Sequence, residues 1–389
     1  MIYLDHNATT PLDRRVRRGM VELLEGSFLG NPSSTHLPGQ RARAILEDAR
    51  RAVAHSLGAD PLEVVFVGGG TESDNLAVLG AVNHLRSAEK PHSVLSSPIE
   101  HPAVLSALAH LKADGVPVYF VQPDAEGRID ARQISDFLQD RPGEVGFMSF
   151  SAANHELGNV YDVASFAETA RFFEPSVVIH CDAVQAFGKV DVDFGCLGVD
   201  MLSVSSHKIG GPTGAGALLL RRGVELDARA LGGGQERGFR PGTENLVALH
   251  GFGQAAGLVV TERQTRRRAC AESRDLLLAA IEQVNGARVH GCREAHSDTT
   301  VLASFSGCEG ELLLIGLDLE GIAVSTGSAC SSGRSKGSAV LAALGFGNAV
   351  AQGALRISVG TNTSPQEIDR FRAVFPGVVD RVRRRGTRG

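Results

Sequence analysis

Short apolar segments that alternate with helical patterns over residues 63–221 constrain the fold of this chain more than any other feature. EVVFV, EVGFMSF, SVVIHCD and GALLLR are apolar on both faces, as strands of a buried parallel sheet are. Helical patterns, for example at 102–113 and 162–173, separate several of them. The alternation predicts an α/β fold, in which a largely parallel sheet wrapped by helices binds ligands at its strand ends.

The pattern changes after about residue 255, where a smaller α+β unit is predicted. It contains helical and strand-like segments at about 255–284, 299–307, 309–319, 354–360 and 365–384. We therefore expect a large ligand-binding domain at 15–255 and a small domain formed by 1–14 and 256–389.

Composition argues against several classes of function. The formal net charge of −5 disfavours nucleic acid as a direct partner, and no apolar run is long enough to span a membrane. Asp5 stands where an export signal would be apolar, which favours a cytoplasmic protein. None of the cysteines forms a CxxC pair, so we expect no zinc ribbon and no bound metal.

Three motifs at predicted strand ends carry chemistry. In FVGGGTESDN a glycine turn opens a helix, which is either a tight structural turn or an anion site with Thr71. Asp182 ends an apolar strand, either as a helix cap or as a carboxylate aimed at a cation. Lys208 stands at the end of another apolar strand, either as a solvated charge or as a Schiff-base amine. Lysine is scarce in this chain, which favours the amine, because arginine does not lose its proton.

These three groups together are what pyridoxal 5'-phosphate requires. Its phosphate needs an anion site, its pyridine nitrogen needs a carboxylate, and its aldehyde needs a lysine. The conjunction is more specific than any single motif.

Ten motifs in order along the whole length make the chain resemble a cysteine desulfurase of the NifS/IscS type. They are YLDHNATTP, GNPSSTH, GGGTESDN, IEHPAVL, NHELG, HCDAVQAFGK, SSHKIGGPTGAG, GGGQERGFRPGTEN, STGSACSSG and LRISVG. That type belongs to the class V aminotransferase group of fold-type I pyridoxal-phosphate enzymes. The resemblance implies a large domain with a mainly parallel seven-stranded sheet flanked by helices, and a smaller α+β C-terminal domain.

The resemblance also implies how the cofactor is held. Lys208 carries it as a covalent aldimine, Asp182 pairs with the pyridine nitrogen, and Gln185 faces the phenolic oxygen. His101 stacks on the ring and shuttles protons. The phosphate ligands are the backbone of Gly70 together with Thr71, Ser205 and His207.

Further implied residues serve the substrate and the neighbouring subunit. Asn154 and Arg356 receive the carboxylate of L-cysteine, with Asn154 also counted among the cofactor contacts. A planar guanidinium suits a carboxylate because it can bind both oxygens. Thr243 reaches the phosphate of the neighbouring subunit, which implies a homodimer.

Cys330 lies among serines and glycines in STGSACSSG. It is either a small buried thiol or a nucleophile on a moving segment, and the resemblance implies the second, with 325–338 as a mobile loop. The thiol takes sulfur from L-cysteine, leaves L-alanine, and passes a persulfide to a protein acceptor of the iron–sulfur scaffold or tRNA-thiolation type. The alternatives are a selenocysteine lyase or C–S lyase of the same fold, or a catalytically degenerate sulfur-transfer paralogue.

The chain departs from the family pattern at several positions. His155 stands where asparagine is usual, Asp74 where asparagine is common, and Gly68 where serine is common. His6 replaces an asparagine, and Lys336-Gly337 replaces a frequent Glu-Pro in the Cys330 loop. The changes near the glycine turn concern phosphate contacts, and those in the loop concern the sulfur acceptor.

Overall fold

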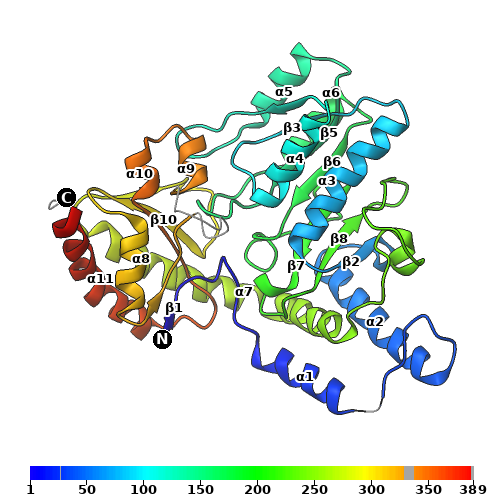
Figure 1. The fold of residues 1–389 in the computed structure, drawn as a ribbon, viewed down its shortest axis with the longest axis horizontal. Coiled ribbons are helices and arrows are strands. Elements are labelled where there is room, and N and C mark those ends of the chain that lie inside the picture. Colours follow the sequence, from blue (N-terminus) through cyan, green and yellow to red (C-terminus); the bar gives the residue numbers. More distant parts are fainter. Residues whose placement is uncertain (27, 328–336, 387–389) are drawn as a thin grey trace.

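The computed structural model describes residues 1–26, 28–327 and 337–386. Figure 1 shows a larger body built on a central sheet and a smaller unit beside it, with both chain termini in the smaller unit. Within the described part of the chain, no helix combines the length and the apolar character that a membrane span requires.

The central sheet has seven strands in the order β2-β8-β7-β6-β5-β3-β4. All neighbours are parallel except that β8 runs antiparallel to both β2 and β7. The predicted mainly parallel seven-stranded sheet is therefore confirmed. Its strands are β2 (Val64–Val67), β3 (Ser93–Ser96), β4 (Val118–Phe120), β5 (Val145–Ser151), β6 (Val178–Asp182), β7 (Met201–Ser205) and β8 (Gly216–Leu220).

Both faces of this sheet are buried, because successive side chains of each strand enter different apolar clusters. In β2, Val64 and Phe66 join one cluster while Val65 and Val67 join the other. Figure 1 shows α3 and α4 together over the sheet, and their side chains fill the second cluster. The helices around the sheet are α2 (Leu37–Ser56), α3 (Gly70–Ser87), α4 (Pro102–Ala113), α5 (Ala131–Asp140) and α6 (Val163–Phe173).

The smaller unit has its own apolar cluster, which includes Leu4 and residues of the 270–382 stretch. Its sheets have the order β12-β10-β9, antiparallel, and β1-β11, parallel. The strands are β1 (Ile2–Tyr3), β9 (Ala287–His290), β10 (Thr300–Phe305), β11 (Ile322–Ala323) and β12 (Ala354–Ser358). The helices are α8 (Gly310–Asp318), α9 (Ala339–Ala343), α10 (Asn348–Gln352) and α11 (Pro365–Gly386).

Helix α7 (Leu246–Glu282) begins earlier than the sequence pattern suggested, and the expected domain boundary near residue 255 falls inside it. The glycines of GFGQAAG made the start of this helix hard to predict, because glycine lowers helix propensity. These glycines allow neighbouring helices to approach closely, since a Cβ added to Gly253 would lie 2.7 Å from the Cα of Ala49 in α2. One added to Gly251 would lie 2.7 Å from the sulfur of Met20, in α1 (Arg14–Glu25).

Short 3₁₀ turns complete the described chain at η1 (Pro61–Glu63), η2 (Ser206–Lys208) and η3 (Gln235–Gly238). The second of them follows β7 directly and carries Lys208 at the carboxyl edge of the parallel strands. The fold thus presents the predicted lysine at the edge where such sheets bind ligands.

Candidate active site

Two adjoining cavities lie at the carboxyl ends of β5, β6 and β7. One has a volume of about 220 Å³ and includes Gly70, Thr71, Asp182 and His207 in its lining. The other has a volume of about 310 Å³ and includes Asn7, Glu156 and Arg356. Both are lined by Ala8, His101, His155, Gln185 and Lys208. The structure therefore brings together most of the site residues predicted from the sequence.

One end of the smaller cavity is suited to an anion. Helix α3 begins there at Gly70 without a side-chain cap from the described residues, so its first N–H groups face the opening. The hydroxyl of Ser205, at the end of β7, lines neither cavity but is buried and has no hydrogen-bond partner in the described chain. An orphaned buried hydroxyl beside a helix N-terminus calls for a ligand acceptor, because an unsatisfied polar group is costly.

Asp182 ends β6 at the same cavity. Its Oδ1 accepts a hydrogen bond from Val184 N at 2.9 Å, so it caps the following turn as well as facing the site. Burial raises its pKa to about 6, while the charge of Lys208 opposes that shift. A cation facing this carboxylate would favour the ionised form further.

Lys208 reaches into the junction of the two cavities. Its amine donates hydrogen bonds to the backbone oxygens of Asn7, at 2.5 Å, and Ala8, at 2.9 Å. Both acceptors belong to the N-terminal segment that follows β1. Residues far apart in the sequence therefore set the position of the amine.

His101 is fixed by its place at the N-terminus of α4. Its Nδ1 accepts the N–H of Ala103 at 3.1 Å, which leaves the proton of the neutral ring on Nε2. Burial lowers its pKa to about 4, and the charges of Lys208 and Arg356 act in the same direction. His101 is therefore a neutral donor at Nε2 around pH 7.

Arg356 extends from β12 into the larger cavity. It donates from one terminal nitrogen to the His155 oxygen at 3.1 Å and from the other to Asp5 Oδ1 at 3.0 Å. Its Nε is buried and lacks a partner among the residues that the structure describes. A buried cation with an unused donor is suited to a small anionic group.

Besides Ser205, three predicted residues are not part of the lining of these cavities. The amide of Asn154 is tied into the local backbone: it donates to Ile99 O and accepts from Glu156 N and Leu157 N, each at 2.9 Å. It lines neither cavity, and the neighbouring His155 lines both. Thr243 is exposed on this chain, away from both cavities. Cys330 and most of the 325–338 loop lie outside the described residues.

The sequence reasoning also missed several residues that the structure places here. Asn7 and Ala8 belong to the quoted YLDHNATTP motif, but nothing in the motif says that their carbonyl groups meet Lys208. Lys189 hydrogen-bonds to Gln185, and the scarcity of lysine that singled out Lys208 applies to it equally. Glu156 gave no signal, because an acidic residue in a loop is usually solvated.

The comparisons with known proteins agree with this geometry. The family "Aminotransferase class-V" matches residues 2–371. An IscS-like cysteine desulfurase of Mycobacterium tuberculosis is 39% identical over 99% of this chain and 98% of its own. A NifS-like protein of known structure is 32% identical, with a TM-score of 0.90 over 97% of this chain and 99% of its own. The structure "SspA in complex with cysteine" is 30% identical, with a TM-score of 0.80 over 94% of this chain and 100% of its own.

Enzymes of this family use pyridoxal phosphate, and the residues present fit that cofactor. The uncapped start of α3 and the orphaned hydroxyl of Ser205 suit a phosphate. The carboxylate of Asp182 suits a pyridinium nitrogen, and the amine of Lys208 suits an aldehyde. With the family match over nearly the whole length and the curated relative at 39% identity, the chain belongs to the class V aminotransferase family, among the IscS-type cysteine desulfurases.

Proposed function

We propose that this protein is a pyridoxal-phosphate-dependent enzyme that removes sulfur from L-cysteine, giving L-alanine and a persulfide on Cys330. The observation that carries the proposal is the position of Lys208. Its amine lies where the two cavities meet, with Asp182 on the side of the smaller one and Arg356 on the side of the larger one. The smaller cavity suits the cofactor and the larger one suits the amino acid.

Bound pyridoxal phosphate supplies an electron sink for the substrate Cα. Lys208 is the residue that carries the cofactor covalently, and Asp182 pairs with the pyridine nitrogen. Gln185 faces the phenolic oxygen, and His101 covers the ring. The phosphate is held by Gly70, Thr71, Ser205 and His207.

Arg356 binds the substrate carboxylate, using the Nε that has no partner in the described structure. The free amine of Lys208, which lies where the two cavities meet, would take the proton from the substrate Cα. The neutral ring of His101 can donate a hydrogen bond from Nε2 to a polar group in the site. His155, rather than Asn154, supplies the polar side chain on this wall of the cavity.

The thiolate of Cys330 attacks the substrate sulfur, because a thiolate is the reactive form of cysteine. The new S–S bond forms as the Cβ–S bond of the substrate breaks. The electron pair of the broken Cβ–S bond stays with the substrate carbon. That carbon takes up a proton and becomes the methyl group of alanine. Gly327 and Val340, on either side of the undescribed stretch, line the larger cavity, which supports this assignment.

The protein acts as a homodimer in which Thr243 serves the site of the partner subunit. Thr243 and Leu231 are both exposed in the segment that leads to α7, as an interface requires. The acceptor of the persulfide is a protein of the iron–sulfur scaffold or tRNA-thiolation type. The cytoplasmic location expected from the sequence stays a prediction.

The chain divides into a large domain of about 15–255 and a small domain formed by 1–14 and 256–389. The cluster that contains Leu4 and residues of α11 shares no member with the two clusters of the central sheet, which supports this division. Helix α7 joins the two domains, since Phe252 packs in one cluster and Leu277 in the other.

Cys330→Ser tests the proposal because it separates sulfur transfer from cofactor chemistry. The spectral change on adding L-cysteine should persist in this variant, since it does not involve the thiol. Release of alanine and sulfide should nearly vanish, because a hydroxyl cannot hold a persulfide. Cys196→Ser, which changes an exposed cysteine, is the matched control and should remain active. Normal sulfide release by Cys330→Ser would mean that sulfur leaves by elimination, as in a C–S lyase.

A further inference from the structure

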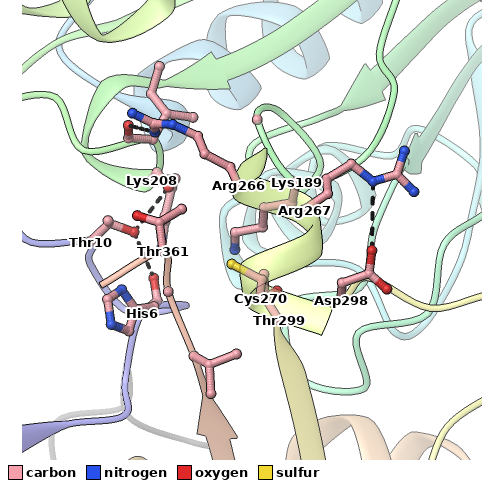
Figure 2. A pocket seen from close by; sticks show the side chains of 14 residues that line it. His6, Thr10, Lys189, Lys208, Arg266, Arg267, Cys270, Asp298, Thr299 and Thr361 are labelled. Atoms are coloured by element: carbon pink, nitrogen blue, oxygen red, sulfur yellow. Dashed lines mark hydrogen bonds and ion pairs between the residues drawn. The ribbon is translucent and has the colours of Figure 1, made fainter. Parts of the chain in front are cut away.

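Lys189 is a second lysine beside Lys208 that the proposed function does not use. It follows β6 in the AVQAFGKV segment, and its side chain enters a small cavity of about 40 Å³ that Lys208 and Cys270 also line. Figure 2 shows its amine directed into this cavity, on the side of Cys270. In the described part of the chain, no carboxylate forms an ion pair with this amine.

The amine of Lys189 instead binds two side-chain amides. It donates to Gln185 Oε1 at 2.7 Å and to Asn7 Oδ1 at 2.9 Å. An amide that presents its oxygen to an ammonium group must turn its NH₂ group the other way. Accordingly, Gln185 Nε2 donates to the Asn7 backbone oxygen at 2.9 Å. Lys189 therefore fixes which way the Gln185 amide faces.

The same contacts connect Lys189 to Lys208. The Asn7 backbone oxygen that accepts from Gln185 Nε2 also accepts from the amine of Lys208, at 2.5 Å. Asn7 is buried, and its amide nitrogen is anchored to Thr300 Oγ1 at 2.8 Å. The two lysines thus hold Asn7 from two sides, one through its side chain and one through its backbone.

Keeping an ammonium group at this position is unfavourable for the fold. Burial lowers the pKa of Lys189 to about 7, and the neighbouring charge of Lys208 acts in the same direction. A buried charge without an opposite charge destabilises a protein unless its hydrogen bonds compensate. An apolar side chain of similar length would avoid this cost but could donate a hydrogen bond to neither amide oxygen.

We propose that Lys189 is a positioning residue of the active site, which acts by holding the Gln185 amide with its NH₂ group toward Asn7 and the cavities. One N–H of that group binds Asn7, and the other is then directed to the phenolic oxygen of the cofactor. The inference rests on the proposed function, in which Gln185 contacts that oxygen. Lys189 itself touches neither cofactor nor substrate.

A double-mutant cycle on cofactor binding tests this role. The full-length parent protein, Lys189→Met, Gln185→Ala and the double variant are dialysed against graded concentrations of pyridoxal phosphate, and bound cofactor is read from its visible absorbance. We expect each single change to weaken binding about tenfold. The double variant should bind no more weakly than Gln185→Ala, because Lys189 acts through Gln185. Lys112→Met, which changes an exposed lysine of α4, is the matched control and should bind as the parent does.

Lys189→Arg separates orientation from general packing. Arginine keeps the cation, and the adjoining cavity of about 40 Å³ gives its larger head group room. We expect it to restore most of the binding that Lys189→Met loses. If Lys189→Met does not fold, Lys189→Gln replaces it and should bind more weakly than Lys189→Arg.

Two results would overturn this inference and leave the proposed function standing. One is cofactor binding by Lys189→Met or Lys189→Gln as tight as that of the parent. The other is a double variant in which the two losses of cofactor affinity multiply. A parent protein that takes up no pyridoxal phosphate would instead overturn the proposed function, and this inference with it.

Discussion

The rings of His101 and His155 meet edge to face, with centroids 5.0 Å apart and planes inclined at 79°. Burial keeps both rings neutral, because it lowers the pKa of His101 to about 4 and that of His155 well below its usual value. Two neutral rings pack at this distance without the repulsion of two imidazolium ions. The unusual histidine of NHELG therefore supports one side of the His101 ring, which we propose covers the cofactor.

His155→Ala should lower kcat/KM for L-cysteine about fivefold, because an aromatic contact of this kind contributes about 1 kcal/mol. His155→Phe keeps a ring at the same place and should retain most of the activity. The two variants are compared by the rate of alanine formation over a range of cysteine concentrations. Equal losses in both would mean that the polar atoms of His155 matter and its ring contact does not.

Asp182→Asn should lower kcat at least about tenfold, which corresponds to about 1.4 kcal/mol. Asparagine keeps the cap on Val184 N but removes the charge that stabilises a pyridinium ion. Alanine formation measures the effect, and Asp114→Asn, an exposed change at the end of α4, is the control. Near-normal activity of Asp182→Asn would leave this carboxylate with the capping role alone.

Glu156→Gln should change how stability depends on pH. Burial raises the pKa of Glu156 to about 7, although the hydroxyl of Ser338 donates to it. The unfolded chain therefore ionises first, and this group's contribution to stability is full below about pH 4.5 and is lost as the pH rises through about 7. The difference in the free energy of unfolding, glutamine variant minus parent, should therefore increase by about 2 kcal/mol between pH 5 and pH 8.

Urea unfolding at several pH values measures that difference. Glu22→Gln, which removes one exposed carboxylate from α1, controls for the change in net charge. A difference between Glu156→Gln and the parent that stays constant over this range would show that Glu156 remains ionised in the folded protein.

Arg50→Met should destabilise the protein by about 3 kcal/mol, because it leaves the buried carboxylate of Glu236 without its partner. The guanidinium of Arg50 binds both oxygens of Glu236, at 2.6 and 2.8 Å, and stacks 4.7 Å from the centroid of the Phe66 ring. Urea unfolding measures the loss. Adding Glu236→Gln to Arg50→Met should recover part of it, and a further loss would show that the ion pair is not the stabilising contact.

This pair has a second consequence, since Glu236 and Arg237 have positive φ angles of 46° and 58°. Such angles are strained for residues with side chains, so the surrounding contacts must enforce them. The bidentate pair supplies that restraint in the segment leading to Thr243.

The sequence predicted well those features that depend on local pattern. The short segments that are apolar on both faces are local signals, and β2, β5, β6 and β8 lie where they indicated. The helical patterns at 102–113 and 162–173 likewise correspond to α4 and α6. Lys208 and Asp182 were found because both stand at the ends of apolar strands. Motif order along the chain then identified the family, which the comparisons confirm.

Features that depend on distant contacts could not be predicted in this way. The early start of α7 was missed because Gly251 and Gly253 resemble helix breakers until the neighbouring helices are known. Whether Asn154 or His155 lines the cavities depends on which of the two side chains is hydrogen-bonded to the local backbone. The role of Lys189 depends on the N-terminal segment, which lies far from it in the sequence.

The place of Asn7 sets the order in which the protein can be assembled. Asn7 is synthesised before Ser358, yet its backbone N–H binds the hydroxyl of Ser358, 351 residues later. β1 likewise needs β11 as its partner. All seven strands of the central sheet can form before β11 and β12 are synthesised. The segment that holds Lys208 can therefore contact the larger unit early, but it gains its partners in the smaller unit only later. Contacts of such long sequence separation form slowly, so the backbone oxygens that bind Lys208 are fixed from both sides only late in folding.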